Sequence, residues 1–229
     1  IGIGEMLIRI CGKAVINIVK ESSSPIHAMK NVFDSEETEA VLLVDASNAF
    51  NSINRKAVIN NINILCPLLA KYVENCYIRP TSLFMIGGSV IKSKEGTTQG
   101  DPLSMATYSL GITPLLTIMI SIMEDLDLSI TTVAFADDIT AGGKISELRI
   151  WWEKLNQYGT LFGYYPQSHK SWVTVKPQKE KEAIDAFKKL DVNITIEGKR
   201  HLGAIIGNDT FKSAYCKTFV NKWKIEIEL

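Results

Sequence analysis

The chain has 229 residues, 46% of them hydrophobic, and a formal net charge of zero at pH 7. This length and composition allow one domain, or one and a half, with a sizeable core, and the zero charge excludes a globally basic nucleic-acid binder. The basic residues are nevertheless concentrated late: from Lys170 onwards there are twelve Lys and Arg against eight Asp and Glu. The four cysteines form no C-x-x-C pair, which argues against a zinc knuckle and for a reduced, intracellular compartment.

Hydrophobic periodicity and turn residues predict an alternation of helices and strands. In chain order we expect a helix over 5–20, a short helix over 26–33, a strand over 41–45, helices over 55–65 and 67–77, a hairpin over 82–92, a long apolar helix to about 123, a hairpin over 130–141, an amphipathic helix over 145–161, a strand over 172–175, a helix over 179–190, and a hairpin with its turn at Gly198. This order indicates an α+β fold, with an antiparallel sheet and helices packed on one face.

The long apolar helix is the segment that most resembles a membrane span. Residues 105–123 carry no charge and approach the length of a bilayer. Gly111, Pro114 and the acidic residues that follow favour instead a helix buried in a globular domain. We expect no transmembrane segment, and no signal peptide, because charged residues interrupt the first apolar stretch at Glu5, Arg9 and Lys13. The predicted location is intracellular, in nucleus or cytoplasm.

Acidic side chains stand at the ends of two apolar segments. Asp45 closes the run 41–44, and Asp137 and Asp138 follow the run 133–136. Such carboxylates are costly unless a cation meets them, and Mg²⁺ prefers hard oxygen ligands. Two ions about 4 Å apart, held by strand-end aspartates, are typical of phosphoryl transfer. The alternative is a structural turn, in which Asp residues are common.

Two further side chains admit both a functional and a structural interpretation. Phe50, five residues after Asp45, could exclude a 2′-hydroxyl from a nucleotide sugar, or it could anchor the following helix in the core. Lys170 follows a turn-rich run and precedes an apolar strand. It could neutralise a triphosphate or protonate leaving pyrophosphate, or it could be a surface lysine.

Residues 96–103 form a glycine-containing loop before the long helix. Asp101 is a good N-cap and Pro102 a good first helical residue, so we expect the helix to begin there. Glycines allow close approach of a ligand, and a helix N-terminus favours phosphate. Gln99 and Gly100 are therefore candidates for contact with an incoming nucleotide or template base.

Together these segments resemble the palm domain of reverse transcriptases, in particular those of non-LTR-type retrotransposons and related retroelements. The likeness rests on Asp45 with Ala49-Phe50, on residues 99–103, and on Ala136-Asp137-Asp138, at the family's relative spacing over about residues 4–207. It implies a polymerase palm with a partial fingers segment and no thumb. The implied divisions are 1–44 for the fingers segment, 45–207 for the palm, and 208–229 for the start of the palm–thumb connection.

The resemblance also implies roles for individual residues. Asp45, Asp137 and Asp138 would be catalytic and would bind two Mg²⁺ ions (with Mn²⁺ as an alternative), together with the carbonyl of Ala46. The implied nucleotide-binding residues are Phe50, Gln99, Gly100 and Lys170. The implied primer-grip residues are His201, Leu202 and Gly203.

The resulting expectation is an RNA-directed DNA polymerase that adds dNTPs to the 3′-hydroxyl of a DNA or RNA primer on an RNA template. One alternative is a viral-type RNA-dependent RNA polymerase. Those enzymes resemble one another in carrying an Asp five residues beyond the first aspartate, where this chain has Phe50. The other alternative is a decayed, non-catalytic nucleic-acid-binding relic of a mobile element.

Overall fold

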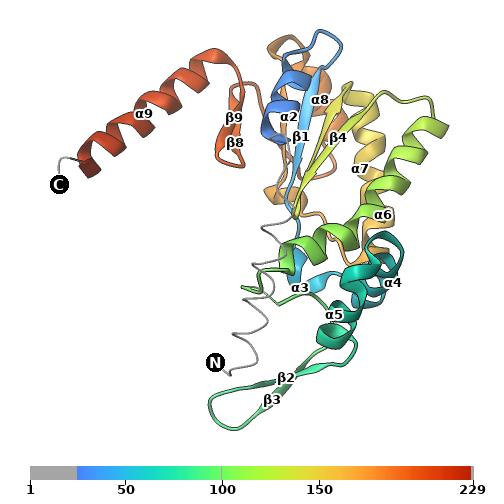
Figure 1. Cartoon of the computed structure of the whole chain (residues 1–229). Helices are drawn as coiled ribbons and strands as arrows, with labels where there is room; N and C mark the ends of the chain where they lie inside the picture. The colour runs from blue at the N-terminus through green and yellow to red at the C-terminus, as the bar shows by residue number, and fades with distance from the viewer. Residues whose placement is uncertain (1–24, 99, 228–229) are drawn as a thin grey trace.

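The structure is a computed structural model that describes residues 25–98 and 100–227. The helix expected over 5–20 and the side chain of Gln99 lie outside the described residues. Figure 1 shows a central sheet with helices on both sides, a hairpin at one end and a helix that extends away from the sheet at the C-terminal side.

The helices and strands alternate along the chain as follows. The α-helices are α2 (Pro25–Asp34), α3 (Ala49–Ser52), α4 (Arg55–Leu65), α5 (Pro67–Tyr77), α6 (Ser104–Asp125), α7 (Ile145–Gly159), α8 (Glu180–Phe187) and α9 (Asp209–Ile227). Short 3-10 helices are η1 (Thr160–Phe162), η2 (Ser168–Lys170) and η3 (Pro177–Lys179). The strands are β1 (Ala40–Val44), β2 (Thr81–Phe84), β3 (Val90–Ser93), β4 (Thr131–Phe135), β5 (Asp138–Gly143), β6 (Trp172–Val175), β7 (Asn193–Thr195), β8 (Gly198–His201) and β9 (Ala204–Gly207).

The central sheet has the strand order β4-β5-β1-β6-β7. β1 pairs antiparallel with both β5 and β6, which confirms the expected α+β sheet. The edge pair β6–β7 is parallel, which the sequence analysis did not expect. The reason is the connection: η3 and α8 lie between these strands, and a helical crossover returns the chain in the same direction, whereas a tight hairpin reverses it.

β1 is apolar at every position because both faces of the sheet are covered. Alternate side chains of a strand point to opposite faces. Ala40, Leu42 and Val44 belong to the main core. Val41 and Leu43 point to the other face and belong to a smaller cluster with Met29 and Phe33 of α2. The expectation of helices on one face only is therefore corrected: α2 covers part of the second face. A fully apolar strand is typical of a strand buried on both sides.

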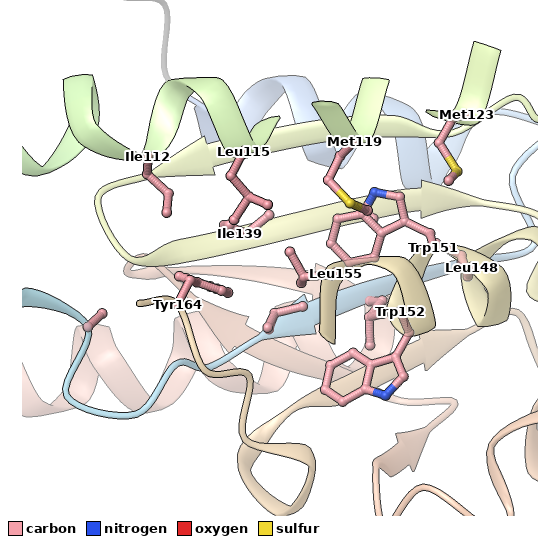
Figure 2. Close-up of a cluster of buried hydrophobic side chains, with 14 of the residues drawn as sticks. Ile112, Leu115, Met119, Met123, Ile139, Leu148, Trp151, Trp152, Leu155 and Tyr164 are labelled. Carbon is pink, nitrogen blue, oxygen red and sulfur yellow. The ribbon is translucent and has the colours of Figure 1, made fainter. Parts of the chain in front are cut away.

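The main core lies between the sheet and helices α6 and α7. Figure 2 shows side chains of α6 pointing toward the sheet and toward the aromatic side chains of α7. The labelled residues that meet there are Ile112, Leu115, Met119, Met123, Ile139, Leu148, Trp151, Trp152, Leu155 and Tyr164. This layer covers one face of the sheet, in which β1 and β5 are paired along their length.

Within the described residues, α6 is the helix whose length and mean hydropathy of 1.6 would suffice to cross a membrane. One side of α6 is buried at three- and four-residue intervals, and the helix contacts α4, α7 and β4. This stripe accounts for the uncharged run in the sequence by packing against the protein core.

Two boundaries near the proposed site differ from the sequence analysis. α6 begins at Ser104 rather than at Asp101, because the Asp101 carboxylate accepts a hydrogen bond from the amide of Leu103 at 2.9 Å and forms a local turn before the helix. The expected turn at Gly198 is also wrong. Gly198 opens β8, and its backbone approaches Gly207 so closely that a Cβ would lie 2.9 Å from the Gly207 Cα.

Gly163 is a glycine that the fold requires, because its backbone packs closely against the backbone of residues 52–54. It has a φ of +75°, and a Cβ there would lie 2.0 Å from the carbonyl oxygen of Ser52. We expect Gly163→Ala to destabilise the protein by more than the roughly 1 kcal/mol of the left-handed backbone alone, because the clash is with backbone. Urea denaturation measures the loss. Gly88→Ala, at φ +85° with nothing within 4 Å, is the matched control, and an equal loss in both variants would contradict the clash.

Candidate active site

The carboxylates of Asp45 and Asp138 lie at adjacent strand ends. Val44 pairs with Ile139, so Asp45, the residue after β1, comes beside Asp138, the first residue of β5. Both side chains line one pocket of about 210 Å³. The neighbour of β1 is thus β5, which begins at Asp138. β4, the strand that precedes Asp137 and Asp138, is at the sheet edge.

Asp137 lies in the two-residue turn that joins β4 to β5. Phe135 pairs with Asp138, so Ala136 and Asp137 make the turn, and Ala136 has a φ of 54°, which is uncommon for a residue with a Cβ. The hydroxyl of Tyr164 donates a hydrogen bond to the carbonyl of Asp137 at 3.0 Å. Tyr164 is buried, so the turn is held from inside the core.

The carboxyl of Asp138 lies within electrostatic reach of both Asp137 and Asp45. The pKa of Asp138 is raised to about 6, chiefly by burial, then by the negative charges of Asp137 and Asp45. Such a set of hard oxygen donors with unfavourable mutual repulsion suits a divalent cation. Among the described residues, no three or more His, Cys, Asp or Glu side chains form a ready-made metal cluster. Mg²⁺ usually takes one or two protein carboxylates and completes its shell with water and phosphate, and its binding to these aspartates stays a prediction.

The backbone of Asp45 is held on both sides by the segment that precedes β6. Its carbonyl accepts from the amide of Gln167 at 2.8 Å, and its amide donates to the hydroxyl of Ser171 at 3.2 Å. Ser171 is fully buried and donates in turn to the carbonyl of Gln167 at 2.8 Å. The sequence analysis did not single out Ser171; a small hydroxyl residue directly between Lys170 and a strand was the available signal.

Ala46 continues this contact as an isolated β-bridge with Pro166. The two hydrogen bonds of the bridge use the carbonyl of Asp45 and the amide of Ser47, which donates to Tyr165 at 2.9 Å. They leave the carbonyl of Ala46 outside the pair. Its role as a metal ligand stays a prediction.

Lys170 lies on the rim of the same pocket. It ends η2, is exposed, and lines the pocket together with Asp45 and Asp138. The structure therefore brings the lysine to the carboxylates, although its chain position alone also fitted a surface residue. Its function toward phosphate stays a prediction.

The predicted primer-grip residues form the tip of the β8–β9 hairpin. His201 pairs with Ala204, so Leu202 and Gly203 make a two-residue turn with φ values of 47° and 85°. The His201 Nε2 lies 3.0 Å from the Thr140 hydroxyl of β5, which ties the hairpin to the central sheet. Burial lowers the pKa of His201, so the imidazole favours the neutral form.

Basic and aromatic side chains that the sequence analysis did not single out complete this pocket. Lys199 Nζ lies 3.9 Å from the ring centroid of Trp172, and both residues line the pocket with Arg200. A cation over an indole ring is held by the ring quadrupole. The pocket thus presents carboxylates on one side and cations on the other, although the net charge of the chain is zero.

Phe50 packs on the α6 side of the site. Its ring stacks on Tyr108 with centroids 4.6 Å apart, and it is only partly buried. Both interpretations of Phe50 are therefore compatible with its position: the ring is anchored in the core and part of it remains accessible. Gly100 is exposed with a φ of 87°, as a loop glycine near a ligand would be.

Comparison with known proteins identifies the family. Residues 1–194 match the family model described as "Reverse transcriptase (RNA-dependent DNA polymerase)". The chain belongs to the reverse transcriptase family. No curated protein matches the sequence.

The fold of this member of the family is similar to that of a solved telomerase. The telomerase from Candida albicans, in complex with a TWJ fragment of telomeric RNA, matches with a TM-score of 0.58 and 11% identity over 88% of this chain. The chain spans 36% of that protein. The Candida tropicalis telomerase in complex with a TWJ fragment of telomeric RNA matches with a TM-score of 0.49 and 13% identity, over 72% of this chain and 32% of that one. At this identity the likeness shows the palm-like fold alone, which agrees with the fold class expected from the sequence.

The raised pKa of Asp138 makes the stability of this reverse transcriptase dependent on pH. An unfolded Asp titrates near 3.9, so between about pH 4 and 6 the folded state binds more protons than the unfolded state. Stability contributed by the neutral carboxyl is therefore lost as pH rises through about 6. In buffer with a chelator, we expect the Tm of Asp138→Asn to exceed that of the wild type at pH 7.5 by a few degrees.

The gain in Tm should shrink progressively below pH 6. Thermal melts of both proteins from pH 4 to pH 8 give the difference curve, with Asp185→Asn, an exposed change on α8, as control. A Tm difference for Asp138→Asn that is the same at pH 4.5 and pH 7.5 would show that the pKa of Asp138 is not raised in the fold.

Proposed function

We propose that this member of the reverse transcriptase family is an RNA-directed DNA polymerase that adds dNTPs to a primer 3′-hydroxyl on an RNA template. The observation that carries the proposal is the meeting of Asp45 and Asp138 at adjacent strand ends, with Asp137 in the turn between β4 and β5. The family match to residues 1–194 favours this activity over the viral-type RNA polymerase.

The residues of the site have separate tasks in this proposal. Asp45, Asp137 and Asp138, with the carbonyl of Ala46, would hold two Mg²⁺ ions. When bound, these ions would supply activation of the primer hydroxyl and stabilisation of charge on the pyrophosphate. Lys170, at the rim of the same pocket, would neutralise the phosphates or donate a proton to the leaving group.

The primer and the nucleotide would approach from different sides of the carboxylates. The hairpin tip with His201, Leu202 and Gly203 would hold the primer terminus beside Asp45 and Asp138, since residues 201 and 202 line their pocket. Phe50 and the loop with Gln99 and Gly100 would contact the nucleotide from the α6 side. Mn²⁺ would substitute for Mg²⁺, because both accept oxygen ligands in octahedral geometry.

The wider assignments follow from the same proposal. Residues 1–44 would contribute part of the fingers, 45–207 the palm, and 208–229 the path to a thumb, although β1 (40–44) is itself the central strand of the sheet. An origin in a retroelement and a location in the nucleus or cytoplasm, where dNTPs and RNA are present, complete the proposal.

Primer extension on an RNA template with Mg²⁺ tests the activity. We expect Asp137→Asn to reduce extension by at least about 100-fold, because metal-assisted charge stabilisation is worth several kcal/mol. The remote Asp185→Asn should extend as the wild type does. Wild-type protein that binds RNA in a salt-sensitive manner but extends no primer would favour the decayed, non-catalytic alternative.

Sugar selection tests Phe50 separately. We expect Phe50→Val to lower the preference for dNTPs over rNTPs by about 10- to 100-fold, because a smaller side chain leaves room for the 2′-hydroxyl. Tyr108→Phe, which keeps the stacked pair, is the control and should retain the preference. Steady-state kcat/KM for both nucleotides gives the ratio. An unchanged ratio in Phe50→Val would leave Phe50 only its role in the core.

A further inference from the structure

Arg55, the first residue of α4, is a buried arginine outside the pocket of the carboxylates. Only 6% of it is exposed, and buried arginines are rare unless their donors are satisfied. Its guanidinium donates from Nε to the carbonyl of Gly96 at 2.7 Å and from Nη1 to the carbonyl of Ser93 at 2.9 Å. Nη2 donates to the Ser93 hydroxyl at 2.9 Å. The guanidinium of Arg55 therefore bonds to Ser93 and Gly96, in the segment that leads into the loop with Gln99 and Gly100.

Tyr77, at the end of α5, holds the other side of that loop. The Arg55 guanidinium lies 5.2 Å from the centre of the Tyr77 ring. The Tyr77 hydroxyl accepts from the amide of Thr98 and donates to the carboxylate of Asp101, both at 3.1 Å. Arg55 thus holds the entry to the loop at residues 93 and 96, and Tyr77 holds Thr98 and Asp101 further along it.

The same loop is fastened to the segment that carries Phe50. The amide of Thr97 donates to the carbonyl of Phe50 at 2.6 Å, and the amide of Gly96 donates to the carbonyl of Ile53 at 2.9 Å. Gly96 has a φ of +80°, and a Cβ there would lie 2.4 Å from the carbonyl oxygen of Asn51. The two elements proposed to contact the nucleotide are therefore parts of one hydrogen-bonded unit.

Glu95 completes the unit at the start of α4. Its carboxylate accepts from the main-chain amide of Arg55 at 2.8 Å, so one residue donates from both backbone and side chain to residues 93–96. Removal of Arg55 leaves its acceptors unpaired, at the greatest cost for the Gly96 carbonyl, whose hydrogen bond to Arg55 is buried. Replacement of Arg55 would thus release the loop rather than shift it slightly.

We propose that Arg55 is a positioning residue that fixes the nucleotide-binding loop against the Phe50 segment and thereby sets dNTP affinity and sugar choice. This inference rests on the proposed polymerase function. It assigns no contact between Arg55 and substrate: Arg55 acts through Gly96 and, by way of Tyr77, through Thr98 and Asp101. A purely structural arginine would instead affect stability without a change in nucleotide selection.

The test compares Arg55→Lys with Arg149→Lys. Lysine keeps the positive charge of Arg55 but cannot reproduce the fork. Arg149 of α7 also donates from Nε to a main-chain carbonyl, that of Ala186 at 3.0 Å, on an element remote from the loop, which makes it a matched control. We expect Arg55→Lys to raise the KM for dNTP about 10-fold or more, to leave kcat within about threefold, and to lower the dNTP-to-rNTP preference. Arg149→Lys should change none of these values.

Hydrogen exchange provides a readout that needs no turnover. In Arg55→Lys the amides of Gly96, Thr97 and Thr98 should exchange at least about 10-fold faster than in the wild type, while the amides of β1 and β5 keep their protection. Loss of protection throughout the sheet would instead mark Arg55 as a general stability residue and overturn the proposal. Unchanged exchange at residues 96–98 would also overturn it, whether or not the wild type extends primers.

Tyr77→Phe is the second variant, since it keeps the ring under Arg55 and removes only the hydroxyl that binds Thr98 and Asp101. We expect the same direction of change in KM and in sugar preference. A fall in kcat with unchanged KM and unchanged sugar preference in both variants would contradict the positioning role. Absence of extension by the wild type would refute the polymerase proposal alone, because exchange at residues 96–98 still decides whether Arg55 holds the loop.

Discussion

The candidate site of this protein depends on the antiparallel pairing of β1 with β5, because this pairing brings Asp45 beside Asp138. Burial of Asp138, followed by the negative charges of Asp137 and Asp45, raises the pKa of its carboxyl, so the ionised form of Asp138 is disfavoured in the fold. The fold holds these carboxylates together with an apolar strand, β1, buried on both faces, and with the α6–α7 layer that packs against it. The packing of the core stabilises the fold and offsets the unfavourable burial of these carboxylates. A bound divalent cation would reduce that unfavourable energy.

Polar contacts hold the backbone of Asp45 and Asp137 in place. Tyr164 fixes the turn of Asp137, whereas Ser171 and Gln167 hold the backbone of Asp45 from the opposite segment. Tyr164, Gln167 and Ser171 lie more than twenty positions from the aspartates that they hold, and all three belong to the segment between α7 and β6. Apolar packing brings the strands together, and hydrogen bonds with defined directions then set the geometry of the site.

Two separate units flank the carboxylates. On one side the β8–β9 hairpin is tied to β5 by His201 and Thr140 and brings Lys199 to the pocket, where it lies over the ring of Trp172 of β6. On the other side Phe50 and the loop after Gly96 form one hydrogen-bonded unit. In the proposed reaction the first unit would serve the primer and the second the nucleotide, so the two substrates would be positioned by independent contacts.

The sequence by itself determined the acidic residues, the α+β class and most elements near the site, because strand-end aspartates, hydrophobic periodicity and glycine turns are local signals. Local signals failed where partners are remote. The parallel β6–β7 pair and the second covered face under α2 depend on tertiary packing. The start of α6 and the turn at Leu202 and Gly203 are set instead by contacts between residues two or three positions apart. Only the fold revealed the contacts of Ser171, Lys199 and Arg55, because each of them contacts residues that are distant in the chain. A hydrogen bond across 126 positions, such as that between Asp45 and Ser171, leaves no periodic trace in the sequence.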